Sequence, residues 1–315
     1  MHEQSHTSNI YKVIKKKFDF YLNSCLSLVF FFLSFFYLST YLIYLNSIMA
    51  YSIEELRTYK AVTIITLFLS IYGSLKYTGV PEGDLAYTPF SGSNFLLFIY
   101  WGVLYLWQII YTAQIFFPDE YRLSVISLVG WHFPIFNVLV YIWSELFTSG
   151  HYILSEIILV INFFNLLSLY FVHKTFTVRP LLNWFLIHVP LTAMPLSWVM
   201  YAIFWNGAVM LHIHKLFGRI LANVFIWDFL LVPGVFLLLF NDWAIGFSNA
   251  YLMFALAFGQ LATKVFALQW IFAFIIAGIL TVWSFVSFAV GGLREEIGEN
   301  APLLVVEEGN VSEPV

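Results

Sequence analysis

Apolar residues occur along most of this chain in runs of about 20, separated by short polar stretches. A helix of that length spans the ~30 Å hydrocarbon core of a bilayer. The runs do not alternate between apolar and polar residues, as the strands of a membrane barrel do. Each run is therefore predicted to be a helix, which satisfies its own backbone hydrogen bonds in lipid. We predict nine membrane-spanning helices, or eight if the first is not one, at residues 22–45, 58–77, 95–117, 124–147, 152–172, 181–205, 220–240, 244–262 and 267–290.

The composition supports this all-α, polytopic membrane helix bundle. Of 315 residues, 61% are hydrophobic and only 10% are charged, against roughly 25% charged in soluble domains. One water-soluble core of this size could not bury so much apolar surface. We expect a cytosolic basic tail at 1–20, the bundle at 21–292 and a disordered acidic tail at 293–315. No basic face is present to bind nucleic acid, and the single Cys25 excludes an internal disulfide.

The first predicted span follows a lysine cluster at residues 12–17 and resembles a signal sequence. Ile48 occupies a position where cleavage requires a small residue, so a retained signal anchor is favoured. Translation starting at Met49 is the alternative. With nine spans, eight Lys and Arg residues lie on the cytosolic side and six on the other. This orientation depends on the lysine cluster, and it places the glycosylation triplet beginning at Asn310 in the lumen.

The run "FIYWGVLYLWQIIYTAQIFFPDEYRLSVISLVGWHFPIFNVLVYIWSELFTSGHYILSEIILVINFFNLLSLYF" resembles a fungal family of multi-spanning membrane proteins of unknown function. The similarity extends over residues 58–290. It implies about eight spans and no assigned activity. The shorter stretch "WGVLYLWQIIYTAQ" is also similar to tryptophan-rich sensory proteins, which bind porphyrins and sterols.

Polar residues within three consecutive predicted spans recur on one helical face each. They are Trp101, Tyr105, Gln108 and Thr112 in the third span, Pro134, Asn137, Tyr141 and Glu145 in the fourth, and Asn162 and Asn165 in the fifth. Such stripes either join helices by hydrogen bonds, at about 0.6 kcal/mol each, or enclose a hydrogen-bonding cavity. The joining role is favoured.

The connection "TSGH" between the fourth and fifth spans brings Glu145, His151 and Glu156 to one membrane surface. Two carboxylates and an imidazole suit a proton relay or a metal ion. The spacing supplies no third fixed ligand, however, and interfacial carboxylates need no special function. We favour a solvated hairpin end and predict no metal site.

The remaining histidines are also interpreted as structural. His212 and His214 lie in a basic segment that is expected to contact lipid headgroups. His188 is deeper, and an interhelical hydrogen bond is its favoured role.

Asp228, five residues before Pro233, is the strongest single candidate for function. A proline cannot donate to the carbonyl four residues earlier, here that of Phe229, and it bends a helix. A carboxylate beside such a bend carries protons or cations in transporters. A structurally paired aspartate is nevertheless favoured. Two small-residue faces, beginning at Ala255 and Ala273, predict close helix contacts in the last two spans.

No phosphate-binding loop, nucleophile elbow or zinc-protease motif is present, so we expect neither an enzyme nor a bound cofactor. Two hypotheses remain. The protein binds or moves a small hydrophobic or amphipathic ligand, or it is a non-catalytic scaffold or assembly factor that contacts other membrane proteins. The expected location is the endomembrane system, with the endoplasmic reticulum favoured over Golgi or vacuole. The candidate ligand-binding residues are Trp101, Tyr105, Gln108, Asn137, Tyr141, Glu145, Asn165 and Asp228.

Overall fold

The computed structural model describes residues 53–78, 84–116, 129–178, 181–211, 213, 216–263 and 268–299. Within these ranges the secondary structure is helical and contains no strand, which confirms the predicted all-α class. The helices form two compact units. Unit 1 comprises residues 1–81 and 101–210, and unit 2 comprises residues 82–100 and 211–315. α3 (Asn94–Gln114) passes from unit 2 into unit 1 after Tyr100.

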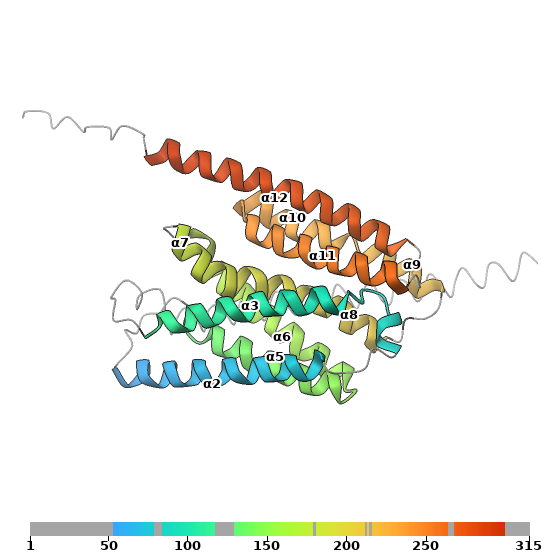
Figure 1. Ribbon diagram of the computed structural model, residues 1–315, viewed down its shortest axis with the longest axis horizontal. Coiled ribbons are helices and arrows are strands. Elements are labelled where there is room, and N and C mark those ends of the chain that lie inside the picture. The colour runs from blue at the N-terminus through green and yellow to red at the C-terminus, as the bar shows by residue number, and fades with distance from the viewer. Residues whose placement is uncertain are drawn as a thin grey trace, which may run out of the picture. The chain divides into compact units, whose positions relative to one another are not determined.

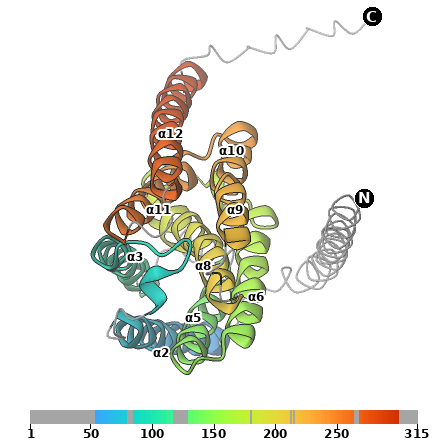
Figure 2. The same ribbon diagram turned by 90° about the vertical axis from the view of Figure 1, so that its right-hand side faces the viewer.

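Unit 1 contains most of α3 and the helices before and after it, which lie side by side in Figure 1. Its other elements are α2 (Ile53–Thr78), α5 (His132–Thr148), α6 (Tyr152–Phe171), η2 (Thr175–Thr177), α7 (Leu181–Asn183), η3 (Trp184–Ala193) and α8 (Met194–Met210). In the end-on view α8 lies between α3 and α6 of this unit (Figure 2). Its fully buried Trp198 contacts Trp101 of α3 and Trp143 of α5, with ring centroids 4.8 and 6.2 Å away.

The predicted sixth span is not one regular helix. A ten-residue π-helix, η3, precedes α8 and contains Pro190. Pro190 and Pro195 cannot donate the backbone hydrogen bonds of a regular α-helix. The wider turn of a π-helix accommodates that gap, and such segments are frequent at functional sites. Every η3 side chain from Ile187 to Ala193 is buried, so this part of the irregular backbone is enclosed by protein.

Unit 2 consists of η1 (Asp84–Tyr87), α9 (Leu216–Phe225), α10 (Asp228–Phe240), α11 (Trp243–Thr263) and α12 (Gln269–Glu299), with the start of α3. The turn between α10 and α11 uses Asn241 in a left-handed conformation (φ 53°), and the Asp242 carboxylate accepts from the Ile245 N–H at 3.3 Å. The predicted small-residue contact is present in α12, where Ala273 and Ala277 are fully buried. A side chain at Gly246 of α11 would collide with Ser284 of α12.

The segment from Thr88 to Ser93 is hydrogen-bonded to α11. The Gln260 amide donates to the carbonyls of Thr88 and Ser91, at 3.1 and 2.9 Å, and the Ser93 N–H donates to the Ala255 carbonyl at 2.8 Å. Gly259 allows this approach, because its missing Cβ would lie 2.5 Å from the backbone of Gly92. The Ala255–Gly259 face was predicted to contact a helix, and the structure places a connecting segment against Gly259 instead.

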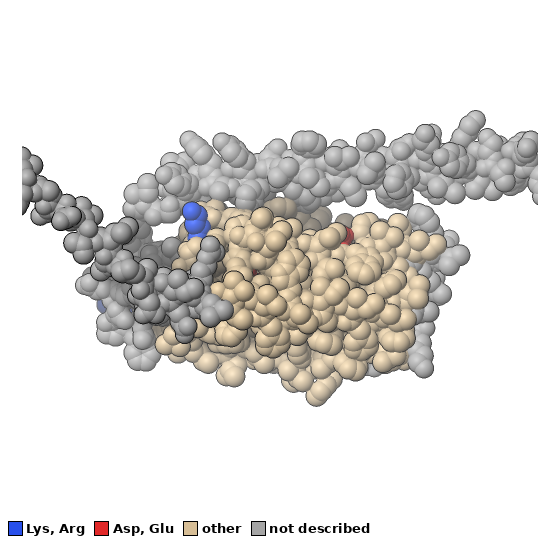
Figure 3. All heavy atoms as spheres, turned by 90° about the horizontal axis from the view of Figure 1, so that it is seen from above, with Lys and Arg blue, Asp and Glu red and all other residues tan. Residues whose placement is uncertain are grey.

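Seven helical stretches among the described residues are long and apolar enough to cross a membrane. The fourth predicted span, at 124–147, corresponds to α5, which has 17 residues and is not among these seven stretches. The first, at 22–45, lies outside the described residues, so the count of nine is not confirmed. α12 continues to Glu299, past the predicted bundle limit at 292. Large apolar side chains such as Phe68, Leu106 and Leu238 are over 60% exposed, and few charged atoms interrupt the face in Figure 3. These surfaces suit a lipid environment.

Candidate functional site

We describe four groups of polar side chains in unit 1 that have partners. The first group joins α2 to α3. The Tyr105 hydroxyl lies 2.9 Å from the Ser70 hydroxyl and 2.6 Å from that of Ser74, and it donates to the Ser70 carbonyl at 3.0 Å. Trp101 stacks on Tyr105 at 5.1 Å. The predicted face of α3 is therefore buried against protein. Its partner is a hydroxyl stripe on α2 that the sequence analysis missed, although the spacing of Tyr59, Thr63, Thr66, Ser70 and Ser74 reveals it.

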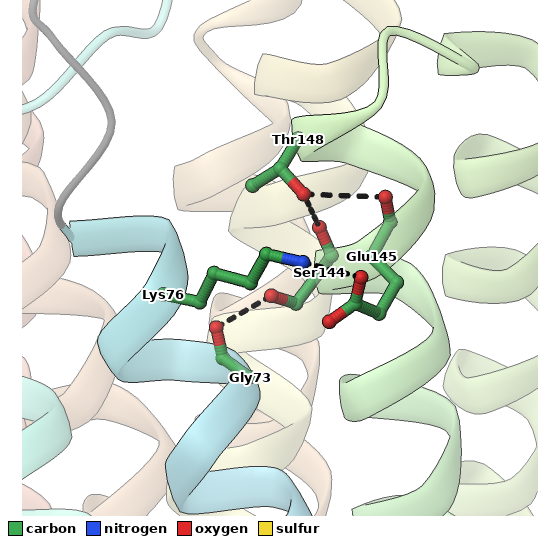
Figure 4. A network of polar contacts seen from close by, with 5 residues as sticks. All are labelled: Gly73, Lys76, Ser144, Glu145 and Thr148. Atoms are coloured by element: carbon green, nitrogen blue, oxygen red, sulfur yellow. Dashed lines mark hydrogen bonds and ion pairs between the residues drawn. The ribbon is translucent and has the colours of Figure 1, made fainter.

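The second group joins the ends of α2 and α5 (Figure 4). The Lys76 ammonium donates to the Glu145 carboxylate at 2.6 Å, with the two side chains 44% and 31% exposed. One turn before Lys76 on α2, the Gly73 carbonyl accepts a hydrogen bond from the Ser144 hydroxyl of α5 at 2.5 Å. Gly73 permits this contact, because a Cβ there would meet Tyr141 and Ser144 at 3.2 to 3.3 Å. Tyr141 is half-buried, and its ring centroid lies 6.5 Å from that of Tyr72.

The third group lies at the other side of the α5–α6 hairpin. The fully buried Asn206 of α8 donates to the Glu156 carboxylate at 2.7 Å and to the Tyr152 carbonyl at 3.0 Å. Its amide oxygen accepts from Ser155 at 2.7 Å. Glu145 and Glu156 are thus held by different helices, α2 and α8, while His151 is exposed. The described part of the chain contains no group of three or more His, Cys, Asp or Glu that could hold a metal ion.

The fourth group contains histidines at the opposite end of α5 and α6. Asn165 forms two hydrogen bonds with His132, one to its ring Nδ1 at 2.8 Å and one to its carbonyl at 3.0 Å. The His173 ring lies 5.2 Å from the His132 ring. His132 and His173 are far apart in the sequence and form no recognisable motif, so sequence reasoning did not select them. His188 is buried with its Nδ1 3.0 Å from the Thr175 hydroxyl, as expected for an interhelical bond.

Midway between these ends, unit 1 buries polar atoms that lack partners. The Gln108 amide nitrogen donates to the Pro190 carbonyl of η3 at 3.1 Å, but its Oε1 has no partner among the described residues. Neither the Oδ1 nor the Nδ2 of Asn137 has a hydrogen-bond partner among the described residues. The Thr63 Oγ1 has none there either. All three side chains are 0% exposed.

The helix register places these three residues at one level. Tyr59 lies beside Trp131, with ring centroids 5.8 Å apart, and Gly73 bonds to Ser144, so α2 and α5 run parallel. That register sets Asn137 level with the α2 turn that begins at Thr63. Tyr111 of α3 packs on Phe133 of α5 at 5.5 Å, one turn from Gln108 and Asn137 respectively. We call Thr63, Gln108 and Asn137 the midlevel cluster.

Asp228 belongs to unit 2, apart from the other candidates. It is half-buried in the first turn of α10, directly after the break at Ile226 and Trp227 that separates α10 from α9. Sequence reasoning placed it within a continuous helix. None of the described residues donates a hydrogen bond to its carboxylate. A negative charge in the first helical turn is favourable, because the backbone N–H groups there have no helical acceptor.

These observations describe a multi-pass helical membrane protein in which Tyr105, Glu145 and Asn165 are paired, whereas the midlevel cluster keeps polar atoms without partners among the described residues. Comparison with known proteins adds a family match: residues 219–308 match the model described as "Fungal protein of unknown function (DUF1774)". This match covers α10 to α12, whereas the resemblance noted from the sequence rested on residues 98–171. An uncharacterized protein of Schizosaccharomyces pombe is 41% identical over 97 residues, which are 30% of this chain and 36% of that protein. No solved structure matches the chain.

Proposed function

We propose that this protein binds a small amphipathic ligand within the membrane, through the midlevel cluster of unit 1. The observation that carries the proposal is Asn137, whose fully buried amide has a partner for neither of its polar atoms among the described residues. In an apolar environment an unsatisfied polar group costs several kcal/mol. A bundle that used Asn137 only to join helices would be more stable with an apolar residue there.

The chemistry of the cluster suggests an uncharged polar group on the ligand. Thr63 offers a hydroxyl, Gln108 an amide oxygen, and Asn137 both a donor and an acceptor. None of these groups is charged, so a charged ligand head would be buried there without a counter-ion, at high cost. A hydroxyl or carbonyl group would satisfy the cluster. The ligand's apolar remainder would then replace contacts with neighbouring side chains.

A static scaffold that contacts other membrane proteins is the second candidate. It is favoured by the candidates that already have partners inside unit 1: Tyr105 with Ser70 and Ser74, Asn165 with His132, and Glu145 with Lys76. Filled polar stripes of this kind are expected of helix-joining residues. The scaffold and ligand hypotheses differ in what they require of Asn137.

Two matched variants test the proposal, because Asn137 and Asn206 are equally buried but differ in their hydrogen bonds. The full-length protein is purified in detergent, and co-purified small molecules are detected by native mass spectrometry. The wild type is expected to retain a neutral amphipathic molecule of defined mass, and Asn137→Leu is expected to lose it. Retention by the variant, or a wild type without any bound molecule, would favour the scaffold.

Unfolding of ligand-free protein supplies a second, independent readout. Asn137→Leu removes an amide without partners, so the unfolding free energy should be unchanged or rise by up to ~1–2 kcal/mol. Asn206→Leu leaves Ser155 and Glu156 without their partner and should cost roughly 2–4 kcal/mol. A similar loss in both variants would mean that Asn137 is paired, against the proposal. Fluorescent fusions at either end test the expected endoplasmic reticulum location.

A further inference from the structure

The hydrogen bonds of Asn165 fix the tautomer of His132. A carbonyl oxygen can only accept, so the Asn165 group that lies 3.0 Å from the His132 carbonyl must be the NH2. The amide oxygen of Asn165 therefore faces the His132 ring at 2.8 Å, and the ring Nδ1 must donate to it. In neutral imidazole the other nitrogen then carries a lone pair. His132 presents an unprotonated Nε2.

This arrangement is the one found around metal-binding histidines. Such histidines donate their second ring N–H to a carboxylate or carbonyl oxygen, which orients the ring and raises its basicity as a ligand. The amide oxygen of Asn165 serves the same role for His132. Asn165 is itself held by the His132 backbone, so the ring and its acceptor form one positioned unit.

A second imidazole lies at the distance that a shared metal ion requires. The ring centroids of His132 and His173 are 5.2 Å apart, with the ring planes 68° from parallel. Zinc–nitrogen bonds of about 2.0–2.1 Å put each ring centroid roughly 3.2 Å from the ion. At a tetrahedral angle, two such rings have centroids about 5 Å apart. We propose that His132 and His173 form a binding site for a divalent transition-metal ion of the zinc type.

The protein supplies two ligands, so water or an external ligand must complete the coordination shell. The affinity is accordingly expected to be lower than that of a structural zinc site with four protein ligands. His173 follows the C-terminal end of α6 by two residues, where the helix dipole favours a cation, whereas His132 begins α5, where the dipole opposes one. Lys174 is the adjacent cation, and its side chain is exposed and therefore screened by solvent and salt.

The test uses full-length protein in detergent, with any polyhistidine tag removed because such a tag binds the same ions. Zn²⁺ binding is measured by calorimetry, and Co²⁺ is added as a spectroscopic probe of tetrahedral coordination. One ion per chain is expected, together with a rise in melting temperature that depends on Zn²⁺ concentration. His173→Gln should weaken Zn²⁺ binding at least tenfold, since it removes one of two ligands. His151→Gln, an exposed histidine elsewhere in unit 1, should bind as the wild type does.

Asn165→Leu tests the positioning role. It should weaken Zn²⁺ binding by about 10- to 100-fold while both imidazoles remain. Melting without metal shows whether each variant folds, and His173→Gln should fold normally because no hydrogen bond of the described residues depends on that side chain. Absence of stoichiometric binding to the wild type, or undiminished binding to folded His173→Gln, would overturn the proposal. Loss of the proposed amphipathic ligand in Asn137→Leu leaves this test unaffected, because the two sites share no residue.

Discussion

Gly259→Ala should destabilise unit 2 by displacing the segment from Thr88 to Ser93. The added Cβ would lie 2.5 Å from the carbonyl carbon of Gly92 and 2.6 Å from the Ser93 nitrogen, where ordinary contacts begin at 3.4 Å. Both neighbours are backbone atoms, so no side-chain rotation can relieve the overlap. The segment would have to move by roughly 1 Å, enough to break the 2.8 Å bond from Ser93 to Ala255.

The magnitude follows from the bonds at risk. Ser93 and Gln260 make three hydrogen bonds across this contact, at 2.8, 2.9 and 3.1 Å. Each contributes about 0.5–1.5 kcal/mol. Alanine recovers up to ~1 kcal/mol, because it is a better helix former than glycine. The net loss is therefore expected to be about 0.5–3.5 kcal/mol in the free energy of unfolding.

Gly102→Ala is the matched control, since Gly102 also lies in a helix but a Cβ there meets nothing within 4 Å. Denaturant unfolding in detergent should show Gly102→Ala as stable as the wild type or slightly more so. A nonspecific protease should cut Gly259→Ala faster than Gly102→Ala between α2 and α3. Equal stability and equal cleavage of the two variants would refute the packing of this segment against α11.

Three further substitutions separate paired from unpaired polar groups. Tyr105→Phe should lower the unfolding free energy by about 1–2 kcal/mol, because Ser70 and Ser74 lose their shared partner; a neutral result in denaturant unfolding would contradict this. Lys76→Met should change stability very little, since its ion pair with Glu145 is exposed, and the small effect should vanish at high salt in the same assay. Asp228→Asn should express and unfold like the wild type if the residue is structural, whereas failure to rescue a null mutant at matched protein level would support proton or cation coupling.

The positions of the helices could be predicted well from apolar runs, because lipid allows few alternatives to a helix. Details within a run could not. The span predicted at 181–205 contains the π-helix of η3, and the span at 220–240 contains the break before Asp228. Hydropathy is equally high on both sides of such breaks. Pro190 and Pro195 signalled the first irregular region without specifying its backbone geometry, whereas Pro233 lies inside α10 and not at the break.

The sequence predicted which helical face carries the candidate residues, but it did not predict their hydrogen-bond partners. Periodicity identified Tyr105 and Asn165 as residues of polar faces, and both are engaged in polar contacts. It could not show that their partners are Ser74 and His132, because a helical face does not specify which helix lies opposite. The same limit applies to Asn137, which periodicity grouped with Glu145 although only Glu145 has a partner among the described residues.

The pattern along α5 bears on which of the two functional hypotheses is physically preferable. Its first residue, His132, is bonded to Asn165, and near its end Ser144 and Glu145 are bonded to α2. Asn137 lies between them and has no partner in the part of the chain that the structure describes. The polar side chains near the two ends of α5 thus have hydrogen-bond partners, although water could also satisfy groups placed there. The Asn137 side chain in the helix interior has none among the described residues. An unpaired amide costs most where water is scarcest. Adhesion between helices alone would favour the opposite distribution, so the unpaired interior amide supports the ligand-binding proposal.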